Sequence, residues 1–424
     1  MQYKEVTSAG RRNNRVFFLF LFFLAFPIIS IGVSISFYLF IYHVFSLPRK
    51  STDRFLKIST GNLKFYLFLL IVIVSLILAP WHLIRGSVFK SAFLLIQYIY
   101  WVFVALYALS LDWDGHASSF GKIITYGLTC LTLTYFLINV RTGNILNLWF
   151  SRNDFVFIFI ALWPIAAGYI GHRFGSAFLK VSLVLTLILM ILSNGRSGLG
   201  IILIENFLIY QVYLGKGLKS LGFIAKLGLV FALVSITFGN IDKARKAIGD
   251  AIGAHSERIG EFIKGEGSGG DLEFDKSWLT RQLMIDKSKE IVRHYPYFGI
   301  GVGNFVRYDA NIGVIYDSKY SRLISGGREK SYYNTRSSHN SYIHILSETG
   351  IFGFLALIWI LVPLLFKSFR SIYLGSIDDK NTVLISIIGI CIHFVAITSI
   401  TGTLTWFIIG SAYACSGIKG SKSL

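Results

Sequence analysis

The hydrophobic residues of this chain are gathered in long blocks that polar stretches separate. Several blocks approach the ~20 residues that a helix needs to cross a bilayer. The pattern therefore predicts an all-α polytopic membrane protein. Spanning helices are expected over residues 63–83, 91–111, 120–140, 155–172, 176–193, 197–214, 219–239, 342–366, 382–400 and 402–416.

The first hydrophobic block, residues 16–46, needs a separate interpretation. As one helix it would be about 46 Å long, which exceeds the ~30 Å hydrocarbon core. Pro27 and Gly32 lie near its middle, where a helix is readily broken. We therefore expect a hairpin of two short helices, which brings the total to about twelve transmembrane helices.

The distribution of charge sets the expected topology. The net charge is +19 and the mean hydropathy is +0.61. With the hairpin counted as two crossings, the basic N-terminus, the basic loops and the C-terminal tail lie on one side, which the positive-inside rule makes cytoplasmic. This use of the basic residues argues against nucleic-acid binding.

The three cysteines fall in apolar blocks, so no disulfide framework is indicated.

Residues 240–341 then form a periplasmic loop domain between an N-terminal transmembrane bundle, 1–239, and C-terminal transmembrane helices, 342–424. This loop is too long for a simple connection. Its second part, 276–341, carries 11 basic and 5 acidic residues. An outward basic surface beside the bilayer favours an anionic ligand, although attraction to anionic lipid headgroups explains the same charge.

The first candidate for chemistry is Arg196, in the sequence SNGRSG between two apolar blocks. A guanidinium this close to the membrane is costly unless it reaches water or a partner. Two spans separate Arg196 from the long loop, so Arg196 and His339 face the same compartment. A basic residue that caps a helix end is the simpler alternative.

The second candidate is Arg281, in SWLTRQLMIDKSKEIVRHYP, residues 277–296. The apolar spacing predicts an amphipathic helix that ends at Pro296, with Arg281 on its apolar face. An arginine in that position requires an anion, which is either a ligand or an internal carboxylate. Lys287 and Lys289 are expected in solvent.

The next two motifs are YFGIGVGNF, residues 297–305, and SSHNSYIHILSETGIFGF, which ends at residue 354. The glycines of the first motif permit a tight loop of close approach, and their spacing does not fit a dinucleotide site.

In the second motif, a helix that starts near Ser341 places His344 and Glu348 on one face, as a structural pair. His339 precedes that helix and, with an ordinary pKa near ~6.5, can accept a proton at neutral pH. A metal site at His339 and His344 lacks a convincing third ligand.

Together these motifs resemble the O-antigen ligase and O-antigen polymerase superfamily of bacterial inner-membrane glycosyltransferases. The resemblance rests on SNGRSG and, most specifically, on residues 281–353, which look like R…P-x-x-G-x-G…H-N-x-x-L-x-E-x-G-x-x-G. The spacing in the last element differs, because Ile343 and His344 precede Leu346.

The resemblance implies inverting transfer of an undecaprenyl-diphosphate-linked oligosaccharide to a sugar hydroxyl on the periplasmic face, without a metal ion or other cofactor. It implies that His339 is the general base and that Arg196 and Arg281 hold the diphosphate. The remaining candidates for substrate contacts are Arg322, Arg328, Arg336 and Asn340.

Three functions remain at this stage. A polymerase transfers the glycan to a lipid-linked repeat, with a chain-length regulator as a further partner, and the divergent loop slightly favours it. A ligase transfers the glycan to lipid A-core. A polysaccharide flippase would show polar residues near the midplane and internal repeats, and the sequence shows no clear repeat.

Overall fold

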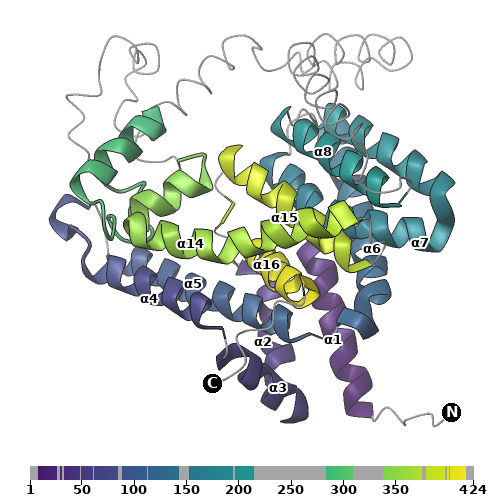
Figure 1. The fold of residues 1–424 in the computed structure, drawn as a ribbon, viewed down its shortest axis with the longest axis horizontal. Coiled ribbons are helices and arrows are strands. Elements are labelled where there is room, and N and C mark those ends of the chain that lie inside the picture. Colours follow the sequence, from purple (N-terminus) through teal and green to yellow (C-terminus); the bar gives the residue numbers. More distant parts are fainter. Residues whose placement is uncertain are drawn as a thin grey trace.

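The computed structural model is a bundle of α-helices, in which the described strands are two segments of two residues each (Figure 1). This confirms the prediction of a helical protein. The structure describes residues 8–25, 29–30, 33–47, 49–60, 62–84, 88–111, 113–142, 152–193, 196–213, 283–308, 338–374, 379–396, 399–400 and 402–416.

The first hydrophobic block is divided between two helices that pack together. Helix α1 spans Ser8–Ala25 and α2 spans Ile35–Phe45. Between them, β1 (Ile29–Ser30) pairs antiparallel with β2 (Val33–Ser34). Because the two strands are antiparallel, the chain reverses direction between α1 and α2, and this interval contains Pro27 and Gly32.

Most of the next helices follow the predicted apolar blocks, but α3 is a helix in a basic stretch where a loop is expected. They are α3 (Arg49–Thr60), α4 (Leu63–Ile77), the 3-10 turn η1 (Trp81–Leu83), α5 (Val88–Ser110), α6 (Trp113–Thr142), α7 (Arg152–Leu192) and α8 (Arg196–Tyr213). Helix α7 is broken at Gly175, where φ is 85° and ψ is 178°. This conformation is essentially restricted to glycine, and it separates the two spans predicted over 155–172 and 176–193.

The C-terminal part begins with a helix over residues 283–294, which ends just before Pro296 as predicted. It continues with α14 (Ser341–Leu374), α15 (Asp379–Ala396) and α16 (Thr403–Ser416). Helix α14 is not the continuous span that the hydrophobic pattern predicts, because it is broken at Gly350, with φ 65° and ψ −168°.

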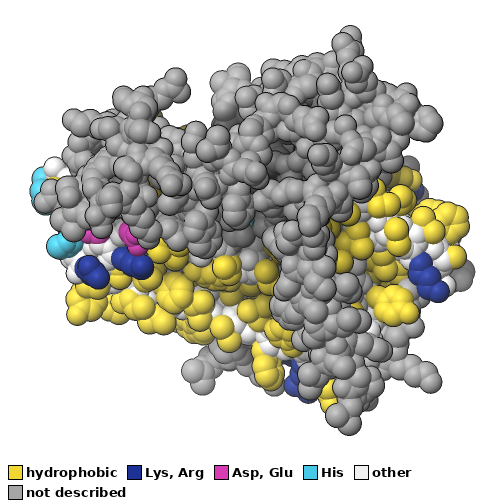
Figure 2. All heavy atoms as spheres, turned by 90° about the horizontal axis from the view of Figure 1, so that it is seen from above, with side chains coloured by type: hydrophobic (Ala, Val, Ile, Leu, Met, Phe, Trp, Pro, Cys, Tyr) yellow, Lys and Arg dark blue, Asp and Glu magenta, His cyan; other side chains and the backbone are white. Residues whose placement is uncertain are grey.

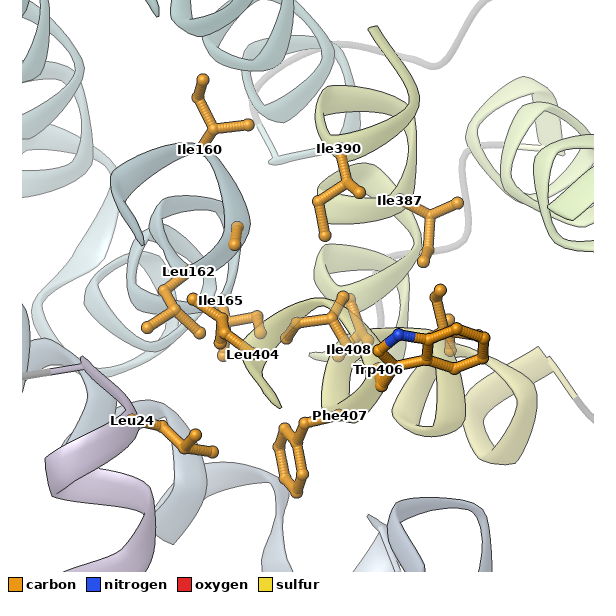
Figure 3. Packing of buried hydrophobic residues seen from close by; sticks show 14 of the residues in the cluster. Leu24, Ile160, Leu162, Ile165, Ile387, Ile390, Leu404, Trp406, Phe407 and Ile408 are labelled. Carbon is orange, nitrogen blue, oxygen red and sulfur yellow. The ribbon is translucent and has the colours of Figure 1, made fainter. Parts of the chain in front are cut away.

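Helix α16 lies in the core of the bundle. Trp406 is fully buried, and its indole N–H donates a hydrogen bond to the carbonyl oxygen of Ile400 at 2.9 Å. Gly410 allows α16 to approach α5, because a Cβ at this position would overlap with the Ala105 carbonyl. Figure 3 shows Trp406 and Phe407 among leucine and isoleucine side chains of neighbouring helices. This packing fixes the start of α16, beside which the candidate site lies.

The outer faces of the helices are apolar enough for a membrane. Figure 2 shows a broad hydrophobic face with lysine and arginine side chains at its edge. Four described helices are long and apolar enough to cross a membrane, or five if the bent pair α3–α4 forms one span. The chain is therefore a multi-pass membrane protein. The total of about twelve helices, the periplasmic loop and the sides of the two termini remain predictions.

Candidate active site

His339 lies directly before α14, and its backbone has a φ of 52°. Within the described part of the chain, it is the one residue other than glycine with a positive φ. Such a conformation costs roughly 1–3 kcal/mol and persists only where neighbouring contacts enforce it. Strained residues of this kind concentrate at functional sites, so the backbone singles out His339 independently of any sequence motif.

The residues on both sides of His339 are held by hydrogen bonds. The Ser338 hydroxyl donates to the Asn340 carbonyl oxygen at 2.8 Å. The Asn340 side-chain oxygen accepts from the backbone N–H of Ile343 at 3.0 Å, which makes Asn340 the N-cap of α14. Its amide nitrogen donates to the Val395 carbonyl oxygen of α15 at 3.0 Å. Asn340 therefore fixes the backbone next to His339, and its predicted contact with substrate stays a prediction.

Ser341 ties the start of α14 to the connection between α15 and α16. Its hydroxyl oxygen accepts hydrogen bonds from the backbone N–H groups of Ser399 at 2.9 Å and Ile400 at 3.3 Å. Ser341 is fully buried. The backbone next to His339 is therefore anchored to α15 and to the connection that follows it.

The break in α14 is the docking site of the glycine-rich loop that follows the helix over 283–294. On one side of the break, the carbonyl oxygen of Glu348 accepts from the Gly301 N–H at 2.9 Å, and Ser347 similarly accepts from Ile300 at 3.0 Å. On the other side, the Ile351 N–H donates to the carbonyl oxygen of Pro296 at 2.8 Å. The loop thus satisfies backbone groups that a continuous helix would pair internally.

This docking depends on close approach between two backbones. A Cβ on Gly350 would overlap with the carbonyl group of Tyr297, and a Cβ on Gly299 would lie 2.5 Å from the carbonyl carbon of Glu348. Gly299 also has a positive φ of 66°. The prediction that the glycine motif serves close approach is confirmed, and its partner is the motif that contains His339.

Glu348 and His344 form the structural pair that the sequence predicts. The His344 Nε2 and a Glu348 carboxylate oxygen are 3.4 Å apart, and both side chains are buried. The other carboxylate oxygen accepts from the backbone N–H of Phe305 at 3.1 Å. The phenyl ring of Phe305 meets the imidazole of His344 edge-on, with the ring centroids 5.5 Å apart. The pair therefore holds the loop against α14.

Lys287 corrects one prediction about the amphipathic helix. The sequence predicts this lysine in solvent, but it is fully buried and its Nζ lies 5.1 Å from the centre of the Phe305 ring. Lys287 is three residues after Met284 and four before Ile291, both buried, so it shares their face of the helix. The heptad spacing used for the prediction identified the helix but misplaced the centre of its buried face. Lys289 is exposed as expected.

Helices α8 and α15 run antiparallel, which fixes where α8 begins. Midway along the pair, Gly389 of α15 lies against Glu205 of α8, since a Cβ on this glycine would overlap with the carboxylate. Tyr213, at the end of α8, and Thr382, near the start of α15, both lie against Gly168 of α7. The start of α8 therefore lies at the same end of the bundle as the end of α15.

Arg196 is the first residue of α8 and lies nine residues before its midway contact with α15, or about 13 Å along the axis. Val395 lies about 9 Å from the same contact, at the same end. Because the carbonyl of Val395 binds Asn340, the backbones of Arg196 and His339 reach the same end of the bundle.

Four predicted site residues, Arg281, Arg322, Arg328 and Arg336, lie outside the described residues. Among the residues that the structure describes, no group of three His, Cys, Asp or Glu side chains could hold a metal ion.

Arg307 is a further polar residue of this region that the sequence pattern does not indicate. Its guanidinium Nη1 donates to the hydroxyl of Ser91 at 3.1 Å, and this hydroxyl donates to the Asn304 side-chain oxygen at 2.7 Å. Burial lowers the pKa of Arg307 from its ordinary value, but a guanidinium remains protonated in proteins. Its position directly after the glycine motif was the only signal in the sequence, because the partner serine is more than two hundred residues away.

The comparison with protein families decides the classification. The family model of the O-antigen ligases matches residues 137–358, more than half of the chain. The chain belongs to the O-antigen ligase family. The segment that matches this O-antigen ligase model contains Arg196, Arg281, the glycine loop and His339. No curated protein matches the chain.

Proposed function

We propose that this member of the O-antigen ligase family transfers an undecaprenyl-diphosphate-linked glycan to a sugar hydroxyl on the periplasmic face of the bacterial inner membrane. The observation that carries the proposal is the left-handed backbone of His339, fixed on both sides and located at the end of the bundle where the helix of Arg196 begins. A base for a hydroxyl nucleophile requires a fixed position, and the anchored segment supplies one.

The proposed reaction proceeds in one displacement. His339 removes the proton from the acceptor hydroxyl as its oxygen attacks the anomeric carbon of the donor. The bond from this carbon to the diphosphate breaks, and undecaprenyl diphosphate leaves with the electron pair. Attack opposite the leaving group inverts the anomeric configuration, and no metal ion takes part in the proposed step.

The leaving diphosphate gains negative charge during this step. Arg196 and Arg281 are proposed to stabilise that charge, because guanidinium groups remain charged and bind phosphate oxygens in pairs. Fixed donors aimed at developing charge lower the barrier. Arg322, Arg328, Arg336 and Asn340 are proposed to contact the diphosphate or the sugars, as the sequence analysis suggests.

Within the family, we favour an O-antigen polymerase, whose acceptor is a second lipid-linked repeat, and a chain-length regulator would be its partner. The alternative is a ligase with lipid A-core as acceptor, since the same site serves both reactions. Deletion of the gene separates them. A lipopolysaccharide core that bears a single repeat supports the polymerase, whereas a bare core with accumulated lipid-linked polymer supports the ligase.

Substitution of His339 by Ala separates a transferase from a flippase. We expect long-chain glycan to be lost while lipid-linked repeats still reach the periplasm. Repeats trapped on the cytoplasmic side would contradict the proposed function and favour transport.

A further inference from the structure

Arg307 belongs to a built polar network outside the residues assigned above. The hydroxyl of Ser91, a fully buried residue in the first turn of α5, accepts from the guanidinium and donates to Asn304. Asn304, also fully buried, donates to the carbonyl oxygen of Ile300 at 2.8 Å. The backbone N–H of Arg307 donates to the Asn304 carbonyl oxygen at 2.9 Å. The guanidinium is therefore held by Ser91 of α5, and Ser91 is itself bonded to the loop that docks on α14.

This network lies beside the start of a helix that is a candidate membrane span. Tyr308 forms a β-bridge with Ile84, in the connection between the end of α4 and the start of α5. Helix α5 is long and apolar enough to cross the membrane from its first residue, Val88. Arg307 thus lies beside the first turn of a helix that is long and apolar enough to cross a membrane.

The helix ends beside Arg307 expose apolar side chains. Ile77 is 70% exposed, Leu78 is 56% exposed and Phe89 is 77% exposed. Lys90, next to Ser91, is also exposed and adds a second positive charge. The molecule has this combination elsewhere too, as Figure 2 shows lysine and arginine side chains at the edge of its hydrophobic face. Where α4 ends and α5 begins, the Arg307 guanidinium and exposed apolar side chains occur in the same region.

We propose that Arg307 binds a phosphate group of the polyprenyl diphosphate lipid, with the isoprenoid chain along the exposed ends of α4 and α5. This inference rests on the proposed function and adds a binding residue to it. A guanidinium held in place by Ser91 loses little side-chain entropy when it binds a phosphate oxygen. Because Asn304 and the glycine loop lie in one hydrogen-bonded segment with Arg307, bound lipid would also stabilise the loop on α14.

A phospholipid headgroup offers the same phosphate chemistry, and a binding experiment distinguishes the two sources. The purified full chain is titrated in detergent with undecaprenyl diphosphate and, separately, with phosphatidylglycerol, and bound lipid is measured by native mass spectrometry. The variants are Arg307→Ala and Arg307→Lys, which keeps the charge but loses the planar fork. Arg293→Ala is the matched control, because Arg293 is exposed at the end of the neighbouring helix.

We expect Arg307→Ala to raise the Kd for undecaprenyl diphosphate at least tenfold, with a smaller increase for Arg307→Lys and none for Arg293→Ala. The Kd for phosphatidylglycerol should change less than twofold. An unchanged Kd for undecaprenyl diphosphate in both Arg307 variants would overturn the proposal. An equal loss of both lipids would overturn it as well, because the site would then bind any lipid phosphate. Binding is measured without glycan transfer, so failure of the proposed role of His339 would not change the interpretation of this result.

Discussion

The backbone N–H of Gly301 donates a hydrogen bond to the carbonyl oxygen of Glu348 at 2.9 Å. This bond joins the glycine-rich loop to the helix that follows His339. The two motifs are therefore one structural unit, although 47 residues separate these two positions in the chain. Because α14 is broken to receive the loop, changes at the break should affect both the stability of the protein and the position of His339.

The Gly350→Ala variant should be strongly destabilised, because the new Cβ combines a disfavoured φ with overlap against the backbone of Tyr297. Gly175→Ala is the matched control. Gly175 has a similar backbone conformation, and a Cβ there would meet no atom within 4 Å. In the control, only the added backbone strain should lower the free energy of unfolding, by roughly 1–3 kcal/mol. Thermal unfolding of the purified proteins measures both, and equal shifts in Tm would show that close approach to the loop is unimportant.

Glu348→Ala should lower the free energy of unfolding by about 1–3 kcal/mol, because the buried N–H of Phe305 loses its acceptor. Glu348→Gln keeps an oxygen at that position and should recover part of the loss. The measurement is unfolding in denaturant, followed by tryptophan fluorescence. If Gln destabilises the protein as much as Ala, the contact with His344 matters more than the bond to Phe305.

Asn340 has two bonds that variants can separate. Asn340→Asp keeps the N-cap oxygen for Ile343 but loses the donor to Val395, whereas Asn340→Ala loses both bonds. Loss of an N-cap costs about 1 kcal/mol, so stability should fall in the order Asn, Asp, Ala. Thermal unfolding tests this order, and an alanine variant as stable as wild type would remove Asn340 from the anchoring of His339.

The sequence predicted most of the helices, because membrane helices are specified by local runs of apolar residues. It also predicted the helix that ends before Pro296 and the pairing of His344 with Glu348, which both depend on spacing within one helix. It missed the break at Gly350, because the apolar run continues through it and the cause is a loop from elsewhere in the chain.

The burial of Lys287 and the role of Arg307 were missed for a related reason. A lysine in an amphipathic helix is ordinarily expected in solvent. The burial of Lys287 is evident only from its packing against the ring of Phe305. Arg307 has no helical pattern around it, and its anchor Ser91 comes from a distant helix. Contacts of this kind depend on tertiary packing, which a single sequence does not specify.

Arg196→Ala and Arg281→Ala should each lower the rate of glycan transfer by roughly 10²-fold or more, since each removes a donor to the leaving diphosphate. Lysine at either position should recover only part of the rate. The rate is measured as release of undecaprenyl diphosphate in a single turnover. Arg293→Ala is the exposed control and should keep the wild-type rate. Wild-type rates in both alanine variants would exclude these arginines from the reaction.

The most direct test compares two histidines of the same segment in the purified full chain. His339→Asn retains a residue that tolerates the left-handed backbone but removes the base, whereas His344→Asn alters the structural contacts with Glu348 and Phe305. Single-turnover transfer from an undecaprenyl-diphosphate-linked glycan should fall by about 10²–10⁴-fold in His339→Asn. Folded His344→Asn should keep a rate within tenfold of wild type. Transfer at the wild-type rate by His339→Asn would contradict the role of His339 as the general base.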